Sequence, residues 1–366
     1  MIPVYKPFLG IAERKYVNDC FESTWISSKG RYISLFEKNF AEYTCTGYAT
    51  SVTNGTVALH LALETLGIAK GDEVIVPTFT YIASVNTIMQ TGAKVVFVDS
   101  LRKSWQVDPA DIKSKVTPRT KAVMAVHLYG LPCDIDQIVQ ICREHDLFLI
   151  EDCAEAFGTY YNDQHVGNFG DVGTFSFFGN KTITTGEGGM VVFNNKKLYE
   201  KAKHLKNQGV SLEKAYWHDT LAFNYRMTNI CAAIGLAQLE KANVILEKKR
   251  LVASWYKKGL QNLPILFHDE LPDTRHSYWM CSVLVETGRI RDALRQHLQD
   301  HEIETRPAFY PAHKMPHCKF DGDFPVAEHI SARGINLPSY PALSHSDVKK
   351  ICKLIKEFFR ERKRKQ

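Results

Sequence analysis

The sequence contains no long hydrophobic run. None of its apolar segments approaches the ~20 residues that a helix needs to cross a bilayer, and 23% of its 366 residues are charged. The first ten residues, MIPVYKPFLG, also lack the basic start and apolar core of a secretory signal. We therefore expect a protein that has no membrane partner and works in the cytoplasm.

Cysteine pairs and metal-binding motifs are missing as well. Nine cysteines are present, but no two are spaced as CxxC, which predicts free thiols in a reducing compartment. His313 and His317 are four residues apart, yet Pro316 lies between them and no HExxH motif surrounds them, so a zinc site is not predicted. The string GNKT at 179–182 resembles the end of a phosphate-binding P-loop but lacks the upstream glycine. We expect neither a bound metal nor NTPase activity.

Low-complexity tracts are absent too, and a composition with 45% hydrophobic residues is that of a globular protein. Part of the net charge of +6 comes from the C-terminal stretch 360–365, RERKRK. We interpret this stretch as a solvated helix end and expect no nucleic-acid partner. A tail that attracts RNA or a membrane surface is the alternative.

Amphipathic segments alternate with short apolar runs from about residue 56 to 194. Runs such as EVIVP, AKVVFVD and LFLIEDC are too apolar to have a wet face. This alternation predicts an α/β fold with a mostly parallel sheet covered by helices on both sides. The pattern changes near residue 245, where strand-like and helical runs mix. We therefore expect a large domain over 1–244 and a smaller α+β domain over 245–366.

The segments LFLIEDCAEAFG and TFSFFGNKTITTGEGG carry the most chemical information. A strand that ends in Asp152 places a carboxylate at the edge of a parallel sheet where such folds bind ligands. Ser176 and Lys181 are five residues apart, and aromatic and glycine neighbours give the lysine the partly desolvated setting that an imine-forming amine requires. Each residue taken singly has a structural alternative: a solvated lysine, a helix cap, a core hydroxyl.

A phosphate site is indicated by SVTNGTVALH at 51–60. Asn54 and Gly55 form a turn and Thr56 opens a helix, so free N–H groups and the positive end of the helix dipole would face an anion. Alone, the pattern is more typical of an ordinary helix cap than of a phosphate site.

Taken together, DCAEAFG, SFFGNK, TGEGG, TNGTVALHLAL and NYRMTNICAAIGLAQL resemble the DegT/DnrJ/StrS family of sugar aminotransferases over essentially the whole chain. The resemblance implies the type I aminotransferase fold, with a seven-stranded sheet and a smaller C-terminal domain. It also implies a pyridoxal 5'-phosphate cofactor, with pyridoxamine phosphate as its aminated form, and a homodimer with shared active sites.

The resemblance further assigns the cofactor contacts. Lys181 would form the Schiff base, Asp152 would pair with the pyridine nitrogen, and Gly55, Thr56 and Ser176 would hold the phosphate. Three other contacts are implied: Tyr81 stacking on the ring, Glu155 near the phenolic oxygen where many relatives have His or Gln, and Asn224 reaching the phosphate from the other subunit.

The implied reaction transfers an amino group from L-glutamate to a nucleotide-linked keto sugar for O-antigen polysaccharide. We expect GDP-4-keto-6-deoxymannose, aminated at C4, with a dTDP- or UDP-linked sugar as the alternative. A non-catalytic regulatory or nucleic-acid-binding protein is a third, remote interpretation. The residues predicted to bind the substrate are Trp25, Lys29, Arg306, Tyr310 and His313, each of which has packing as its alternative.

Overall fold

The computed structural model describes residues 1–318, 320 and 322–365. Its largest element is a seven-stranded sheet with the order β1-β9-β8-β5-β4-β2-β3. These strands are β1 (Tyr48–Val52), β2 (Glu73–Pro77), β3 (Lys94–Val98), β4 (Thr120–Val126), β5 (Phe148–Asp152), β8 (Val172–Ser176) and β9 (Gly189–Phe193). All of them run in one direction except β9, which is antiparallel to both of its neighbours. The predicted mostly parallel sheet of seven strands is confirmed.

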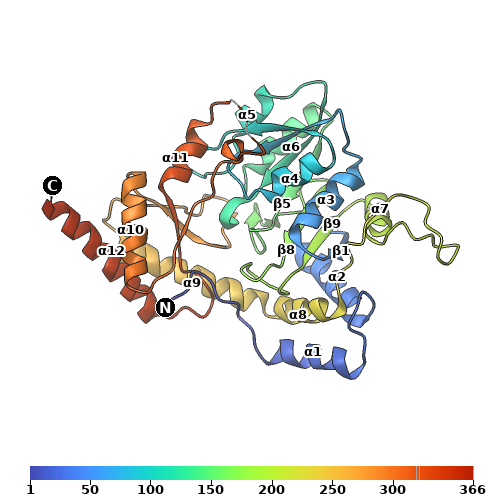
Figure 1. Cartoon of the computed structure of the whole chain (residues 1–366), viewed down its shortest axis with the longest axis horizontal. Coiled ribbons are helices and arrows are strands. Elements are labelled where there is room, and N and C mark those ends of the chain that lie inside the picture. The colour runs from blue at the N-terminus through green and yellow to red at the C-terminus, as the bar shows by residue number, and fades with distance from the viewer. Residues whose placement is uncertain (319, 321, 366) are drawn as a thin grey trace.

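Helices cover both faces of this sheet, as expected (Figure 1). Side chains alternate along each strand, so Val74 and Val76 of β2 join one core with α3 and α4 while Ile75 joins a second core with α5 and α6. The helices around the sheet are α1 (Ile11–Glu22), α2 (Arg31–Thr44), α3 (Gly55–Leu66), α4 (Ala83–Gln90), α5 (Pro109–Ser114), α6 (Ile135–Glu144), α7 (Lys196–Lys206) and α8 (Asn229–Glu240).

A second, four-stranded sheet has the order β10-β12-β14-β13 and its own core. Its strands are β10 (Leu266–Phe267), β12 (Cys281–Leu284), β13 (Arg306–Pro307) and β14 (Gly334–Leu337), and the helices in this half are α9 (Ala242–Leu260), α10 (Gly288–Asp300), α11 (Pro325–Arg333) and α12 (His345–Lys365). Short elements complete the fold: β6 (Tyr160–Tyr161), β7 (Gln164–His165), β11 (Thr274–Arg275) and the 3-10 turns η1 (Leu128–Gly130) and η2 (Ala312–Lys314).

The division of the chain near residue 245 remains a prediction. Helix α9 runs without interruption through residues 244 and 245 and reaches from the large sheet to the second one (Figure 1). The N-terminal residues lie beside the second sheet, because Ile2 forms a bridge with Ile303. Among the described helices, none is both long and apolar enough to span a membrane.

Candidate active site

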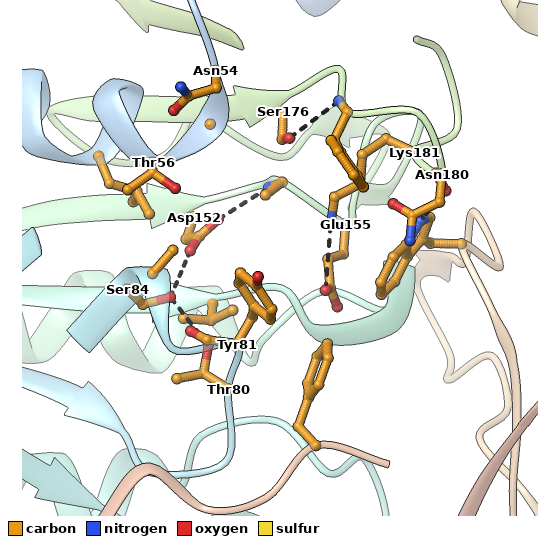
Figure 2. A pocket seen from close by; sticks show the side chains of 18 of the residues that line it. Asn54, Thr56, Thr80, Tyr81, Ser84, Asp152, Glu155, Ser176, Asn180 and Lys181 are labelled. Carbon is orange, nitrogen blue, oxygen red and sulfur yellow. Dashed lines mark hydrogen bonds and ion pairs between the residues drawn. The ribbon is translucent and has the colours of Figure 1, made fainter. Parts of the chain in front are cut away.

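A cavity of about 540 Å³ lies where the carboxyl ends of the parallel strands meet residues of the second sheet. This is the edge at which open α/β sheets bind ligands. Eight predicted site residues line it: Gly55, Thr56, Tyr81, Asp152, Glu155, Ser176, Lys181 and Arg306. Figure 2 shows most of them around one space. The structure therefore gathers residues that are far apart in the sequence.

Asp152 is buried at the end of β5. Its carboxylate accepts hydrogen bonds from the Ser84 hydroxyl at 2.8 Å and from the Ala154 N–H at 3.1 Å. Burial raises the pKa of Asp152, and the two hydrogen bonds and the Lys181 charge oppose this effect. Within the described residues the carboxylate forms no ion pair. A buried acid without a cation is costly, so a protonated pyridine nitrogen suits this position.

Lys181 and Glu155 lie next to each other on one side of the cavity (Figure 2). The Lys181 Nζ lies 3.5 Å from Glu155 Oε1, and the Tyr129 N–H donates to Glu155 Oε2 at 3.0 Å. Burial raises the pKa of Glu155 to about 7, although the Lys181 charge and the Tyr129 N–H lower it. The Tyr5 hydroxyl donates to the Lys181 carbonyl at 2.5 Å and fixes the lysine backbone.

The N-terminus of α3 and the end of β8 form a cradle. A Cβ added to Gly55 would lie 2.6 Å from the Ser176 Cβ, so only glycine permits this approach. The Asn54 side chain caps α3 by accepting from the Val57 N–H at 3.0 Å. In the described part of the chain the N–H groups of Gly55 and Thr56 have no acceptor. Together with the Ser176 hydroxyl they fit a phosphate.

Tyr81 follows β2 and is 58% exposed, with its ring 5.8 Å from that of Phe309. Figure 2 shows the ring between Asp152 and Glu155. An exposed aromatic ring at this place suits contact with a flat cofactor ring. Its predicted stacking role stays a prediction.

The predicted substrate residues are divided among several places. Arg306 lines the cavity, and its guanidinium nitrogen lies 3.7 Å from a carboxylate oxygen of Glu304. Trp25 and Lys29 line a different cavity of about 520 Å³. Tyr310 is 60% exposed and does not line either cavity. Of the predicted substrate residues, the single chain thus brings Arg306 to the cofactor cavity.

His313 does not line either cavity, and its substrate contact stays a prediction. It lies in η2 with 1% exposure, its Nδ1 is 2.7 Å from the Thr78 hydroxyl, and its Nε2 is 3.2 Å from Glu328. Because protein groups occupy both ring nitrogens, the side chain in this structure ties the Pro-rich segment to the end of β2.

Asn224 lies on the loop between α7 and α8, which projects from the body of the molecule (Figure 1). Its side chain is exposed and its backbone forms a bridge with Asn207. It does not line the cavity of its own chain. The contact of Asn224 with the site of a second subunit stays a prediction.

Most of the other cavity residues escaped the sequence analysis, among them Ser84, Asn180 and Trp279. Ser84 lies in the first turn of α4, where a serine is ordinarily a helix-start residue. Asn180 has a buried side-chain oxygen without a hydrogen-bond partner in the described structure. Trp279 comes from the second half of the chain, and no local sequence pattern marks it.

The fold and the site define a pyridoxal-phosphate aminotransferase. The family model "DegT/DnrJ/EryC1/StrS aminotransferase family" matches residues 9–356, so the chain belongs to this family. The expected family, fold and cofactor are thereby confirmed.

Similar proteins narrow this class. The chain is 57% identical to the GDP-perosamine synthase of Escherichia coli O157:H7, over 99% of each chain. It is 55% identical to the GDP-perosamine synthase of Vibrio cholerae, over 98% of this chain and 99% of the relative. The crystal structure of the aminotransferase TlmJ from Streptoalloteichus hindustanus superposes with a TM-score of 0.95 at 31% identity, over 99% of both chains.

Proposed function

We propose that this protein transfers the amino group of L-glutamate to the C4 ketone of GDP-4-keto-6-deoxymannose and so makes GDP-perosamine for polysaccharide synthesis in the cytoplasm. The observation that carries the proposal is the placement of Lys181 and Asp152 in one cavity with the Gly55–Ser176 cradle. The names of two relatives at 57% and 55% identity support the choice of substrate.

The residues divide the work by their chemistry. Bound pyridoxal phosphate supplies an electron sink that stabilises negative charge on the substrate carbon. Asp152 would keep a proton on the pyridine nitrogen, and the α3 N-terminus would bind the phosphate. The Lys181 amine, when neutral, would accept a proton at Nζ from the α-carbon of the amino donor and give it up to the bound cofactor within the same half of the reaction. In the second half it would deliver a proton to C4 of the sugar. Arg306, at the cavity rim, is the candidate for contact with the anionic substrate.

The position of the reactive lysine is tested by reducing the holoenzyme with borohydride and mapping the labelled peptide. We expect the label on Lys181 of the wild-type protein. The Lys181→Ala variant should lack the visible cofactor band that shifts when glutamate is added. A label on another lysine would contradict the proposal.

The nucleotide is tested by assaying GDP-, dTDP- and UDP-linked 4-keto-6-deoxy sugars with glutamate. We expect turnover with the GDP sugar. Turnover restricted to the dTDP or UDP sugar would overturn the substrate assignment and leave the aminotransferase class intact.

We further propose that two copies of the chain assemble into a homodimer with shared sites. Supporting this proposal, the loop that carries Asn224 exposes large apolar side chains: Leu212 is 99% exposed, Tyr216 98% and Leu221 91%. Exposed apolar side chains grouped on one projecting loop are typical of an interaction surface.

A further inference from the structure

The indole ring of Trp279 lies directly over the amino group of Lys181. The distance from Nζ to the ring centroid is 3.9 Å, and Trp279 is only 5% exposed. Trp279 comes just before β12 of the second sheet, so the second half of the chain reaches into the cavity at its reactive atom.

Several contacts fix this ring in place. Its N–H donates to the Asn180 carbonyl at 2.8 Å, and its face is stacked with Tyr129 at 6.0 Å and 13°. The backbone carbonyl of Trp279 accepts a hydrogen bond from the fully buried Lys249 ammonium at 3.2 Å. The ring is therefore held before any ligand binds, a requirement for a group that orients a reacting atom.

A glycine makes this approach possible. Gly130 has a φ of +97°, and a Cβ there would lie 2.4 Å from the Ser277 hydroxyl oxygen and 3.0 Å from the Trp279 backbone nitrogen. The Ser277 N–H instead donates to the Gly130 carbonyl at 3.0 Å. The tryptophan segment thus packs against the backbone of η1, the turn that follows β4.

An aromatic face attracts an ammonium ion and offers it no lone pair. In this structure the other partner of the Lys181 amine is Glu155, at 3.5 Å. An indole on one side and a carboxylate on the other define one position for a lysine amine that is not bonded to the cofactor.

Building on the proposed function, we infer that Trp279 is a positioning residue for the reaction. Together with Glu155 it holds the free Lys181 amine at one place beside the cavity. The same nitrogen is then available to move a proton in both halves of the transfer.

The inference is tested by nuclear magnetic resonance on the full chain loaded with pyridoxamine phosphate, in which the Lys181 amine is free. Reductive methylation with ¹³C-formaldehyde places methyl groups on Nζ, and the indole ring current should shift their proton signal upfield. The signal is assigned by its absence from Lys181→Arg. We expect Trp279→Leu to move it to the range of ordinary lysines and Trp279→Phe to leave a smaller upfield shift.

Trp255 provides a matched control, because its ring packs at a tilt against His345 and does not line the cavity. Trp255→Leu should leave the Lys181 signal unchanged. A wild-type Lys181 signal without an upfield shift would overturn the inference, and this outcome does not depend on whether any variant folds.

Kinetics supply a second readout. In single-turnover measurements we expect Trp279→Leu to slow proton transfer about tenfold in both half-reactions, the scale of one lost cation–π contact. Trp279→Phe should recover part of the rate. Equal rates in Trp279→Leu and wild type would also overturn the inference. The borohydride label on Lys181 tests the proposed function separately and does not depend on Trp279.

Discussion

Two buried carboxylates in the cavity have different surroundings. Glu155 lies 3.5 Å from the Lys181 amine, whereas Asp152 is bonded only to the Ser84 hydroxyl and the Ala154 N–H within the described residues. Burial raises the pKa of both groups. The difference in partners supports different proposed tasks: Asp152 has room for a cationic ligand group, whereas Glu155 has a cationic partner in the protein.

Asp152→Asn should separate charge from shape at this position. The amide keeps the size and the Ser84 contact but cannot hold a proton on the pyridine nitrogen. We expect the turnover number to fall on the order of 100-fold or more, the scale of a lost acid–base group, with the cofactor still bound. The checks are steady-state kinetics and the visible spectrum; a variant with undiminished turnover would remove Asp152 from the proposed mechanism.

Glu155→Gln should change the pH dependence of stability. The pKa of Glu155 rises from 4.5 to about 7 in the folded chain, so between these values the folded state binds more protons than the unfolded state. Glu155 therefore contributes stability that is fully present below pH 4.5 and is lost as the pH rises through about 7, with a total of about 3 kcal/mol.

The measurement is urea unfolding of the cofactor-free full chain from pH 5 to pH 8. Wild type should lose free energy of unfolding over this range relative to Glu155→Gln. Glu144→Gln is the control, because the pKa of the exposed Glu144 is lowered by Lys113 and lies below this range. Parallel curves for wild type and Glu155→Gln would contradict the raised pKa.

At the scale of elements, the start of α3 combines a structural cap with a binding site. Asn54 caps α3 at the cavity, and Asn195 caps α7 in the same way by accepting from the N–H groups of Lys197 and Leu198. The two asparagines have one structural task, but only Asn54 lines the cavity. They form a natural pair for an experiment.

Asn54→Ala and Asn195→Ala should each cost about 1 kcal/mol of stability, the usual value of a lost cap. Only Asn54→Ala should also weaken cofactor binding, since it loosens the helix start whose N–H groups face the phosphate. Chemical denaturation and cofactor titration by absorbance provide the comparison. Equal cofactor affinity in the two variants would remove the α3 N-terminus from the site.

At the scale of the whole molecule, the cavity is complete only when both halves of the chain meet. The large sheet supplies Asp152 and Ser176, and the second half supplies Trp279 and Arg306. The projecting loop with Asn224 lies outside this cavity. A second copy of the chain is the proposed recipient of that loop.

Subunit mixing tests the shared site. If Asn224 serves the partner's cavity, a heterodimer of Lys181→Ala and Asn224→Ala has one site with both defects and one intact site. Random reassociation of two inactive variants should then restore about a quarter of wild-type activity, because about half of the dimers are mixed. Mixing Lys181→Ala with Asp152→Asn is the control and should restore nothing if both residues act within one chain. No recovery in the first mixture would place Asn224 outside the partner's site.

The sequence alone determined the main sheet and the centre of the site. Strands buried on both faces must be apolar throughout, so runs such as LFLIEDC reveal a parallel sheet, and polar residues at the ends of those strands necessarily share one edge. Asp152 and Ser176, each at the end of a strand, were predictable for this reason. Lys181 follows Ser176 closely along the chain, and Gly55 begins the helix after β1. Their spacing along the chain is set by local elements.

The tertiary structure alone decided which distant residues reach that edge. Trp279 arrives because Gly130 leaves room for its segment, while His313 is held away by Thr78 and Glu328. Neither placement has a local pattern, because each depends on contacts between segments far apart in the sequence: Trp279 belongs to the same core cluster as residues of the large sheet. The composition and spacing of residues in a segment predict the structure of that segment. The contacts that the segment makes across the cavity depend on how the whole molecule packs.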